Sequence, residues 1–539
     1  MLVALLACSS PTPASTSTST PSTSASGPVA GDTLVVAANF DPGNLNPIVA
    51  PYQLSGYYIG VTQLGLVERR ADETGLLHVP ALAESWEWSE DGRTVTFQLM
   101  EGIIWSDGQP VTARDAAFTF ELILDESVAS NWFAASKKIE AVEVVDDRHV
   151  AFRFFDAGLK PYMMDELRHG LLPEHVLRDA DRSSIRGHEY SRMPMATGPW
   201  KLASWDKEAK LVLEPNDSVV ARPRPHLSRV ITKIVPEYAT QLIELENGSV
   251  DMLFQVELPD VPALKREHPE IELLVEPASG MEYLGWNNAD PMFSDARVRR
   301  AMTLAIDVDR IISDMFEVEG HTYASRCLGT VGPNTGAWIN PDIEALPYDP
   351  EAAKALLDEA GWTDTDGDGV RDRGGQKMTV TVMIQNGIVK SEKVVIRVQA
   401  QLAQIGVDLQ IQALEPNLFS SRARAHDFQA ILWGFGNNPK VDPTIQWHST
   451  GQYNWMSYRS PEVDRLLDEA MATSDLEAAQ DKVRQVQALV YADQPATFLF
   501  WEDNVGAIHS RFRDVEQNTF TAFVQLERWY VPTEEQKYR

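Results

Sequence analysis

Residues 81–123 read ALAESWEWSEDGRTVTFQLMEGIIWSDGQPVTARDAAFTFELI and hold a strand pattern followed by a helix pattern. In the strand pattern, residues 93–100, apolar side chains recur at every second position: Val95, Phe97 and Leu99. This alternation predicts a half-buried antiparallel strand. Residues 149–155, HVAFRFF, repeat the alternation and predict a second strand.

The helix pattern begins at Thr112, which stands three residues before Asp115 in a capping-box-like arrangement. One face of the predicted helix is apolar: Ala116, Phe120 and Ile123. Residues 295–312, DARVRRAMTLAIDVDRII, carry another apolar stripe and predict a core-facing helix. Strand and helix patterns alternate from Asp32 onward, which indicates the α/β class.

A third helix is predicted between Asp349 and Gly361. Asp349 suits the capping position, Pro350 the first turn and Gly361 a left-handed exit. The segment 378–384, MTVTVMI, then alternates like a strand. The stretch between them therefore joins a helix to a strand.

Composition limits the classes of partner. The chain has 539 residues, enough for two to four domains at about 100 to 200 residues each. Its formal net charge is -31, so the surface repels phosphate backbones and anionic headgroups. Nucleic acid is not expected as a partner.

The first thirty residues predict a membrane anchor and a tether. Residues 1–8 end in Leu5, Leu6, Ala7 and Cys8, an arrangement that resembles a bacterial lipoprotein cleavage box in which Cys8 would carry lipid. The leader is short and lacks a basic start, which suggests an upstream start codon. Residues 9–30 are almost wholly Ser, Thr, Pro, Ala and Gly, and predict a disordered linker.

Enzyme motifs are absent from the sequence. There is no phosphate loop, no HExxH zinc helix and no GxSxG elbow. The SxxK match at Ser204–Lys207 lies in a predicted hairpin and lacks companion motifs. We therefore expect no catalytic residues and no enzyme, with an extracellular hydrolase as an alternative from another class.

The region 81–123 closely resembles the signature region of family 5 extracellular solute-binding proteins of ABC transporters, the peptide- and nickel-binding type. Its motif residues are Trp86, Asp91, Gly92, Phe97, Trp105, Asp107, Gly108, Thr112, Ala113 and Asp115. Further matching segments are LLPEHVL at 171, ATGPWKL at 196, LENGSVDM at 245, LGWNNADPMFSDARVRRAMTLAIDVDRI at 284, DPEAAKALLDEAGW at 349 and SPEVDRLLDEA at 460. The resemblance extends from Gly31 to the C-terminus.

The resemblance implies a periplasmic-binding-protein-like fold of type II, cluster C: a two-lobed Venus flytrap with an extra inserted domain. Lobe I would comprise residues 31–66, 190–286 and 498–539, the inserted domain residues 67–189, and lobe II residues 287–497. A solute would bind between the lobes and be delivered to ABC permease subunits. The protein would be an extracytoplasmic monomer, lipid-anchored in the periplasm or on the outer face of the cell membrane. A sensory role, in which the same fold presents its ligand to a receptor, is a further alternative.

The same resemblance implies where the solute binds. Residues 431–455 match the family segment that lines the cleft in lobe II, which makes these residues candidate contacts: Trp433, Phe435, Asn437, Asn438 and Trp447. Tyr52 is the candidate from the N-terminal segment. Peptide-binding members place an aspartate before the Asp-Pro pair, and here Asn437 and Asn438 stand in its place. An oligopeptide is the expected solute, with an oligosaccharide or other neutral solute as the alternative.

The stretch DTDGDGVRDRGG, residues 364–375, resembles a calcium-binding loop. The candidate ligands are Asp364, Asp366, Asp368 and Asp372, but Gly375 stands where such a loop needs a bidentate glutamate. We expect no cofactor, and treat calcium at this loop as a weaker alternative with an affinity of about 10⁻⁴ to 10⁻³ M.

Overall fold

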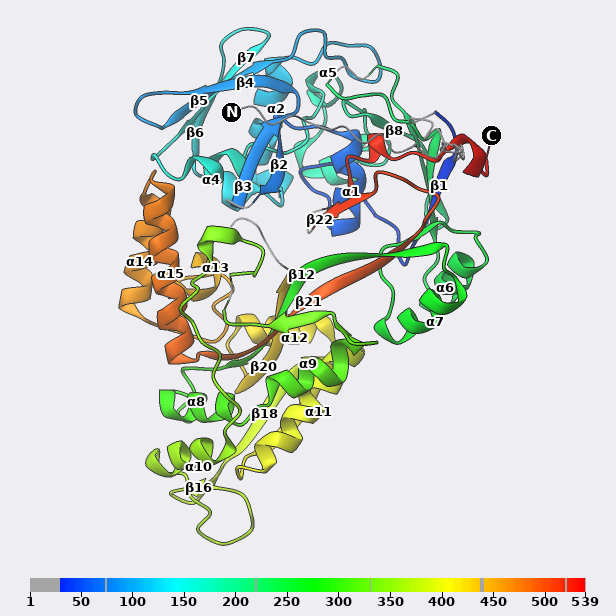
Figure 1. Ribbon diagram of the computed structural model, residues 1–539. Helices are drawn as coiled ribbons and strands as arrows, with labels where there is room; N and C mark the ends of the chain where they lie inside the picture. The colour runs from blue at the N-terminus through cyan, green and yellow to red at the C-terminus, as the bar shows by residue number, and fades with distance from the viewer. Residues whose placement is uncertain are drawn as a thin grey trace, which may run out of the picture.

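The computed structural model describes residues 30–72, 75–218, 221–329, 331–436, 441–518 and 521–538. Two bodies lie one above the other in Figure 1 and are joined by two long strands, β12 (Ile271–Trp286) and β21 (Ala496–His509). Within the described residues, one eleven-stranded sheet runs through both bodies in the order β19-β18-β20-β12-β21-β11-β1-β10-β9-β8, with β15 beside β21.

Lobe I is the upper body built on β1 and β8–β11. Its strands are β1 (Thr33–Ala38), β8 (Trp200–Asp206), β9 (Lys210–Pro215), β10 (Arg229–Ile234), β11 (Met252–Leu253), β22 (Glu516–Asn518) and β23 (Thr521–Val524). Its helices are α1 (Gln53–Thr62), α6 (Tyr238–Glu246) and α7 (Val261–Glu267). The SxxK match lies in the β8–β9 hairpin, as predicted.

A separate four-stranded sheet, β4-β5-β7-β6, lies beside lobe I. This inserted domain contains β2 (Val67–Asp72), β3 (Gly75–Pro80), β4 (Ala83–Trp88), β5 (Thr94–Leu99), β6 (Ile139–Val144) and β7 (His149–Phe154). Its helices are α2 (Ala113–Ile123), α3 (Phe133–Ser136), α4 (Lys160–Asp165) and α5 (Glu174–Leu177).

Lobe II is the lower body, built on β18, β19 and β20 and on the ends of β12 and β21 that pair beside them. Its strands are β13 (Glu317–Val318), β14 (His321–Thr322), β15 (Ala324–Arg326), β16 (Asp372–Arg373), β17 (Gln376–Lys377), β18 (Thr379–Gln385), β19 (Asp408–Leu414) and β20 (Ala430–Gly436). Its helices are α8 (Ala296–Leu304), α9 (Val308–Phe316), α10 (Pro350–Glu359), α11 (Val389–Ala403), α12 (Pro416–Arg424), α13 (Thr444–Trp447), α14 (Pro461–Ala472) and α15 (Leu476–Asp493). Helices α8–α11 cover one face of the sheet and α12–α15 contribute to the core on the other.

Most local predictions are confirmed. Val95, Phe97 and Leu99 of β5 are fully buried and β5 pairs antiparallel with β4 and β7. Thr112 and Asp115 form the predicted capping box of α2. The side chain of Asp349 accepts a hydrogen bond from the backbone of Ala352 at the start of α10.

The apolar stripe at 295–312 belongs to two helices instead of one. Helix α8 ends at Leu304, and Asp307 caps α9 by accepting a hydrogen bond from the backbone N–H of Arg310 at 2.9 Å. A mid-stripe aspartate that bonds the backbone offers the chain a new helix start. Both helices still bury their predicted residues in the same core.

Strand β12 has a bulge where it passes from one lobe to the other. Residues 271–276 of β12 pair with residues 504–509 of β21, whereas residues 280–286 pair with both β21 and β20. Pro277 has no N–H to donate and Ala278 has a φ of 51°, so the ladder is interrupted there. The predicted border of lobe I at residue 286 lies at the end of β12. Glu276, the last residue paired before the bulge, lies ten residues earlier. The other predicted domain borders stay predictions.

A second contact joins the bodies on the side away from these strands. Tyr162 of α4 donates its hydroxyl hydrogen to the carbonyl oxygen of Val441, and its ring stacks on Trp338 at 5.7 Å. Both residues belong to a buried apolar cluster that joins the inserted domain to lobe II. In Figure 1, α4 lies at the left and the crossing strands leave toward the right. None of the helices in the described residues has the length and apolarity needed to span a membrane.

Candidate functional site

A cavity of about 740 Å³ opens where lobe I meets the inserted domain. Its walls come from α1, the start of β2, the segments around Trp132 and His169, and the β22 and β23 region. Strand β22 contacts β12, and in Figure 1 it lies between α1 and the crossing strands. The cavity volume is in the range of small-molecule sites, about 300 to 1,000 Å³.

Four arginines line this cavity: Arg69, Arg70, Arg168 and Arg222. Arg69 and Arg168 both approach the carboxylate of Asp165, at 3.4 and 3.0 Å, and Arg222 pairs with Glu68. Burial and the neighbouring Arg168 lower the pKa of Arg69 to about 10, so the guanidinium remains charged at neutral pH. The same walls carry the carboxylates of Glu68, Glu516 and Glu527, so four guanidinium groups and three carboxylates line the cavity.

Trp132 provides a flat apolar wall next to these charges. Its indole N–H donates to the carbonyl of Pro47 at 3.0 Å, which fixes the ring. The ring of His169 stacks on it at 4.4 Å, and the guanidinium of Arg168 lies 5.5 Å from the ring centroid. An aromatic face beside fixed guanidinium groups suits a solute that has both apolar and carboxylate parts.

Lobe II contributes an aromatic cluster at the end of β20. Trp433 lies 5.3 Å from Phe419 and 5.1 Å from Trp455, and Phe435 lies 5.5 Å from Tyr453. Trp433, Phe435 and Tyr453 are half-buried, so parts of their rings reach solvent. The strand carries them alongside Met281 and Tyr283 of β12.

The predicted contact residues fall in different places. Tyr52 lines the cavity and is 52% exposed, and its ring packs on Phe40 at 5.5 Å. Trp447 is 1% exposed and packs on Tyr458 and Phe498, so in this conformation it is a core side chain.

Three predicted residues, Asn437, Asn438 and Cys8, lie outside the described residues, as does the linker apart from Ala30. The contact roles of Trp433, Phe435 and Tyr52 stay predictions.

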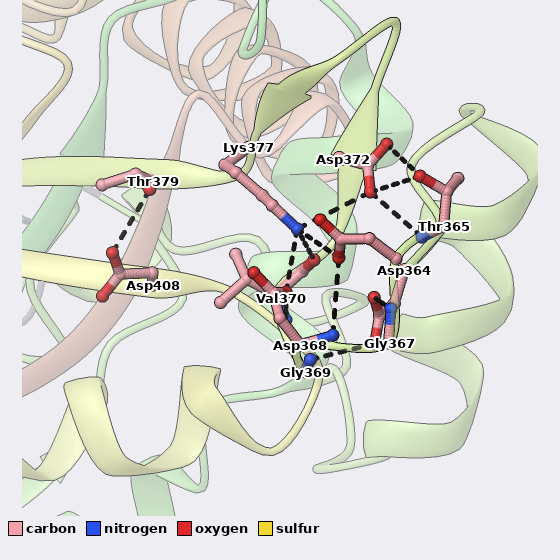
Figure 2. Close-up of polar contacts among 11 residues, drawn as sticks. Asp364, Thr365, Gly367, Asp368, Gly369, Val370, Asp372, Lys377, Thr379 and Asp408 are labelled. Carbon is pink, nitrogen blue, oxygen red and sulfur yellow. Dashed lines mark hydrogen bonds and ion pairs between the residues drawn. The ribbon is translucent and has the colours of Figure 1, made fainter.

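The Asp-rich loop contains its own cation (Figure 2). The ammonium group of Lys377 lies 2.6 Å from a carboxylate oxygen of Asp366 and 2.8 Å from one of Asp368. Hydrogen bonds to these two carboxylates raise the pKa of Lys377 above its usual range. Oxygens of Asp364, Asp366 and Asp372 lie close enough together to hold a metal ion. Calcium would have to displace Lys377 or share its carboxylates.

Backbone groups satisfy the rest of that loop. Asp364 accepts hydrogen bonds from the N–H groups of Gly367 and Gly369, and Asp372 accepts from the N–H and hydroxyl of Thr365. The loop leads into the β16–β17 hairpin and then β18, as the helix-to-strand prediction requires.

Carboxylates also gather where β12 and β21 cross between the lobes. Lys390 at the start of α11 lies 3.0 Å from Glu282 and 2.5 Å from Glu502. Burial opposes the charge of Lys390, but the two carboxylates outweigh it and raise the pKa of Lys390. Glu276, six residues before Glu282 on β12, has a different environment: burial raises its pKa to about 7.

Two bodies joined by two crossing strands, with a cavity on one side and an aromatic cluster on the other, define the class of bilobal binding proteins that close on a solute. The model for bacterial extracellular solute-binding proteins, family 5, matches residues 78–457, and the chain belongs to this family. Proteins of this family are extracytoplasmic solute-binding components of transporters.

Proteins of this family with known names are similar in sequence to this chain over most of its length. The oligopeptide-binding protein AppA of Bacillus subtilis is 26% identical over 462 residues, which cover 84% of this chain and 83% of the relative. The nickel-binding periplasmic protein of Escherichia coli is 26% identical over 475 residues, covering 85% and 86%.

Solved structures confirm the periplasmic-binding-protein fold. AppA from Bacillus subtilis in complex with a nonapeptide superposes with a TM-score of 0.77 at 25% identity, covering 94% of this chain and 100% of that one. NikA from Brucella suis in complex with Fe(III)-EDTA has a TM-score of 0.82 at 21% identity, covering 93% and 100%, and supports the fold alone.

The arginines, Trp132 and Glu276 were missed by reasoning from the sequence. Arg69, Trp132 and Arg168 are separated by tens of residues along the chain, and no short motif joins them. The adjacent arginines 69 and 70 in an acidic chain were the available signal. Which carboxylates would neutralise them is decided by the fold.

Proposed function

We propose that this protein captures an oligopeptide between its two lobes and delivers it to the permease subunits of an ABC transporter. It acts outside the cytoplasm, held to the membrane by lipid on Cys8. The family includes relatives whose names specify oligopeptide, nickel and heme. Family membership therefore leaves the solute open, and the choice depends on the residues of the site.

The observation that carries the proposal is the set of arginines in the cavity beside Trp132. A peptide has a terminal carboxylate, which guanidinium groups bind through charge-assisted hydrogen bonds. A neutral oligosaccharide offers hydroxyl groups but no negative charge, so its hydrogen bonds to these guanidinium groups are weaker than those of a carboxylate. The aromatic cluster around Trp433 supplies apolar surface for side chains from the other lobe.

Capture requires that the two half-sites meet. A solute can touch both the cavity on lobe I and the cluster on lobe II only when the lobes close about the crossing strands. Binding therefore favours the closed state, because the solute has a more favourable interaction free energy with it than with the open state. No bond to the solute has to be made or broken.

The test is a thermal shift of the purified protein with peptide and oligosaccharide libraries. Peptides should raise the melting temperature in a concentration-dependent way, because a ligand at about one hundred times its Kd stabilises by about 2.7 kcal/mol. Oligosaccharides should have little effect. Stabilisation by oligosaccharides without stabilisation by peptides would overturn the proposal.

Two variants locate the binding. Arg168→Met should weaken binding of peptides with a free carboxylate more than that of C-terminally amidated peptides, and Trp433→Ala should weaken both. The matched controls are Arg114→Met, an exposed arginine of α2, and Trp88→Ala, a partly buried tryptophan of β4. Neither control should change the affinity.

A further inference from the structure

Glu276 is the last residue of β12 that pairs with β21 before the bulge between the lobes, and it stands opposite Asn504. This places its carboxylate at the hinge, on the face of the sheet that also carries Leu274 and Phe254. The group is partly buried. Any movement of one lobe relative to the other takes place next to it.

The contacts of this carboxylate are few. The amide of Asn504 donates to it at 3.5 Å and to the carbonyl of Phe254 at 3.2 Å. In the described part of the chain no Lys, Arg or His nitrogen forms an ion pair with Glu276. Glu282 and Glu502, by contrast, share the ammonium of Lys390. Glu276 thus has no cation partner in the described part of the chain, whereas Asp503, the other carboxylate at the bulge, accepts a hydrogen bond from the backbone N–H of Ala278 at 2.8 Å.

Three aromatic rings, one of them that of Phe254, pack on one another, and Asn504 links the backbone of Phe254 to Glu276. Tyr57 lies 5.5 Å from Phe254 and 6.3 Å from Phe523, and Phe254 lies 5.7 Å from Phe523. Burial, and to a smaller extent the charge of Glu276, raise the pKa of Tyr57 to about 12. Tyr57, Phe254 and Glu276 are all half-buried, so solvent reaches this group.

The group is continuous with the cavity. Phe523 lines the cavity and packs on Tyr57, and the side chain of Gln53, also a lining residue, hydrogen-bonds to Tyr57. A solute in the cavity could therefore extend one end to the hinge. An anionic carboxylate beside aromatic faces is the chemistry that attracts an ammonium group.

We propose that Glu276, with Tyr57 and Phe254, binds a protonated amine of the captured solute at the hinge. The inference rests on the proposed function and deepens it, since it specifies a cationic group at one end of the solute and a carboxylate at the arginines. A peptide with a free amino terminus has both. The ammonium replaces the missing counter-charge of Glu276 and is itself removed from water by the closing lobes.

The experiment compares two pools of random pentapeptides, one with free amino termini and one N-acetylated, by thermal shift. Wild-type protein should be stabilised strongly by the free-amine pool and weakly by the acetylated pool. Glu276→Gln keeps the shape and the hydrogen bond from Asn504 but removes the charge, so the larger shift should fall to that of the acetylated pool. Glu276→Asp, which keeps the charge on a shorter side chain, should retain part of the difference.

Glu272→Gln is the matched control, because Glu272 is an exposed glutamate on the same strand. It should behave like the wild type. If Glu276→Gln keeps the preference for free amines, the role of Glu276 is overturned while peptide binding stands. If neither pool stabilises the wild type, the proposed function fails and the inference fails with it.

Discussion

Single side chains at the hinge and in the cavity determine the charge of the binding surface. Arg69 and Arg168 share Asp165, and Glu282 and Glu502 share Lys390, so these charges are already paired within the protein. Glu276 has a hydrogen bond from Asn504. Its raised pKa indicates that the folded protein holds the charged form at a cost.

That cost makes stability depend on pH. Because the folded-state pKa of Glu276, about 7, lies above the ordinary 4.5, the folded protein binds more protons than the unfolded chain between these values. The free energy of unfolding should therefore fall as pH rises through this window. Glu276→Gln removes this loss. The free energy of unfolding of the variant minus that of the wild type should therefore be about 2 kcal/mol larger at pH 8 than at pH 4. Because Glu276 is partly exposed, this difference is smaller than for a fully buried carboxyl group.

Urea denaturation of both proteins at the two pH values measures the difference. Glu272→Gln should show a difference from wild type that does not change with pH. An equal effect of Glu276→Gln at pH 4 and pH 8 would mean that the carboxyl group titrates normally.

At the scale of elements, the loop between α10 and β18 shows how a metal-like sequence can be satisfied without metal. Asp364 and Asp372 bond the backbone of the loop, while Asp366 and Asp368 hold Lys377 from the following hairpin. Lys377 lies beyond the quoted stretch, and β16–β17 pairing folds it back over the loop. Calcium could therefore bind this loop only in competition with the ammonium group of Lys377 for these carboxylates.

Lys377→Gln should convert the loop into a better cation site. With the ammonium removed, Asp364, Asp366, Asp368 and Asp372 repel one another, and calcium at or above about 10⁻³ M should raise the melting temperature of the variant more than that of the wild type. Lys354→Gln, at a partly buried lysine of α10 that pairs with Glu351, is the control. A calcium response of the wild type as large as that of Lys377→Gln would show that Lys377 does not compete.

At the scale of the molecule, both the crossing strands and a side-chain contact attach lobe II to the rest. The crossing strands form the covalent connection, and Tyr162 with Trp338 and Val441 forms a non-covalent one. The second contact holds Val441, which follows the segment carrying Asn437 and Asn438. Rotation about the hinge that widened the space between the bodies on this side would break it.

Tyr162→Phe should shift the protein toward more open arrangements. The lost hydrogen bond is worth about 0.5 to 1.5 kcal/mol, so solute affinity should fall by up to about tenfold. The radius of gyration of the solute-free protein, measured by X-ray scattering, should increase. Tyr348→Phe, at a 39% exposed tyrosine of lobe II, should change neither quantity. A compact Tyr162→Phe variant with unchanged affinity would contradict the prediction.

Local structure was predictable because it depends on neighbours in the chain. The capping box at Thr112, the alternation in β5 and the Asp349 cap all involve residues a few positions apart. The break between α8 and α9 was missed, because the apolar stripe continues across Asp307 and only its side-chain hydrogen bond to Arg310 reveals a new helix start.

The site was predictable in part. The segment with Trp433 and Phe435 was found through resemblance, and Tyr52 lies on the cavity wall. The burial of Trp447 depends on contacts with Tyr458 and Phe498, which nothing in its own segment reveals. The arginine cavity required strands, loops and helices from three parts of the chain to be brought together.

The sequence by itself determined the α/β class, the family and most helix and strand positions, since periodicity and capping are local and family motifs are contiguous. Tertiary structure decided which charges meet. Arg69 and Arg168 both pair with Asp165, and Lys377 pairs with the carboxylates of the Asp-rich loop. Glu276 lies at the hinge without the ammonium group of Lys390, which Glu282 and Glu502 share. Electrostatic energies depend on distance and burial in space, and separation along the chain specifies neither.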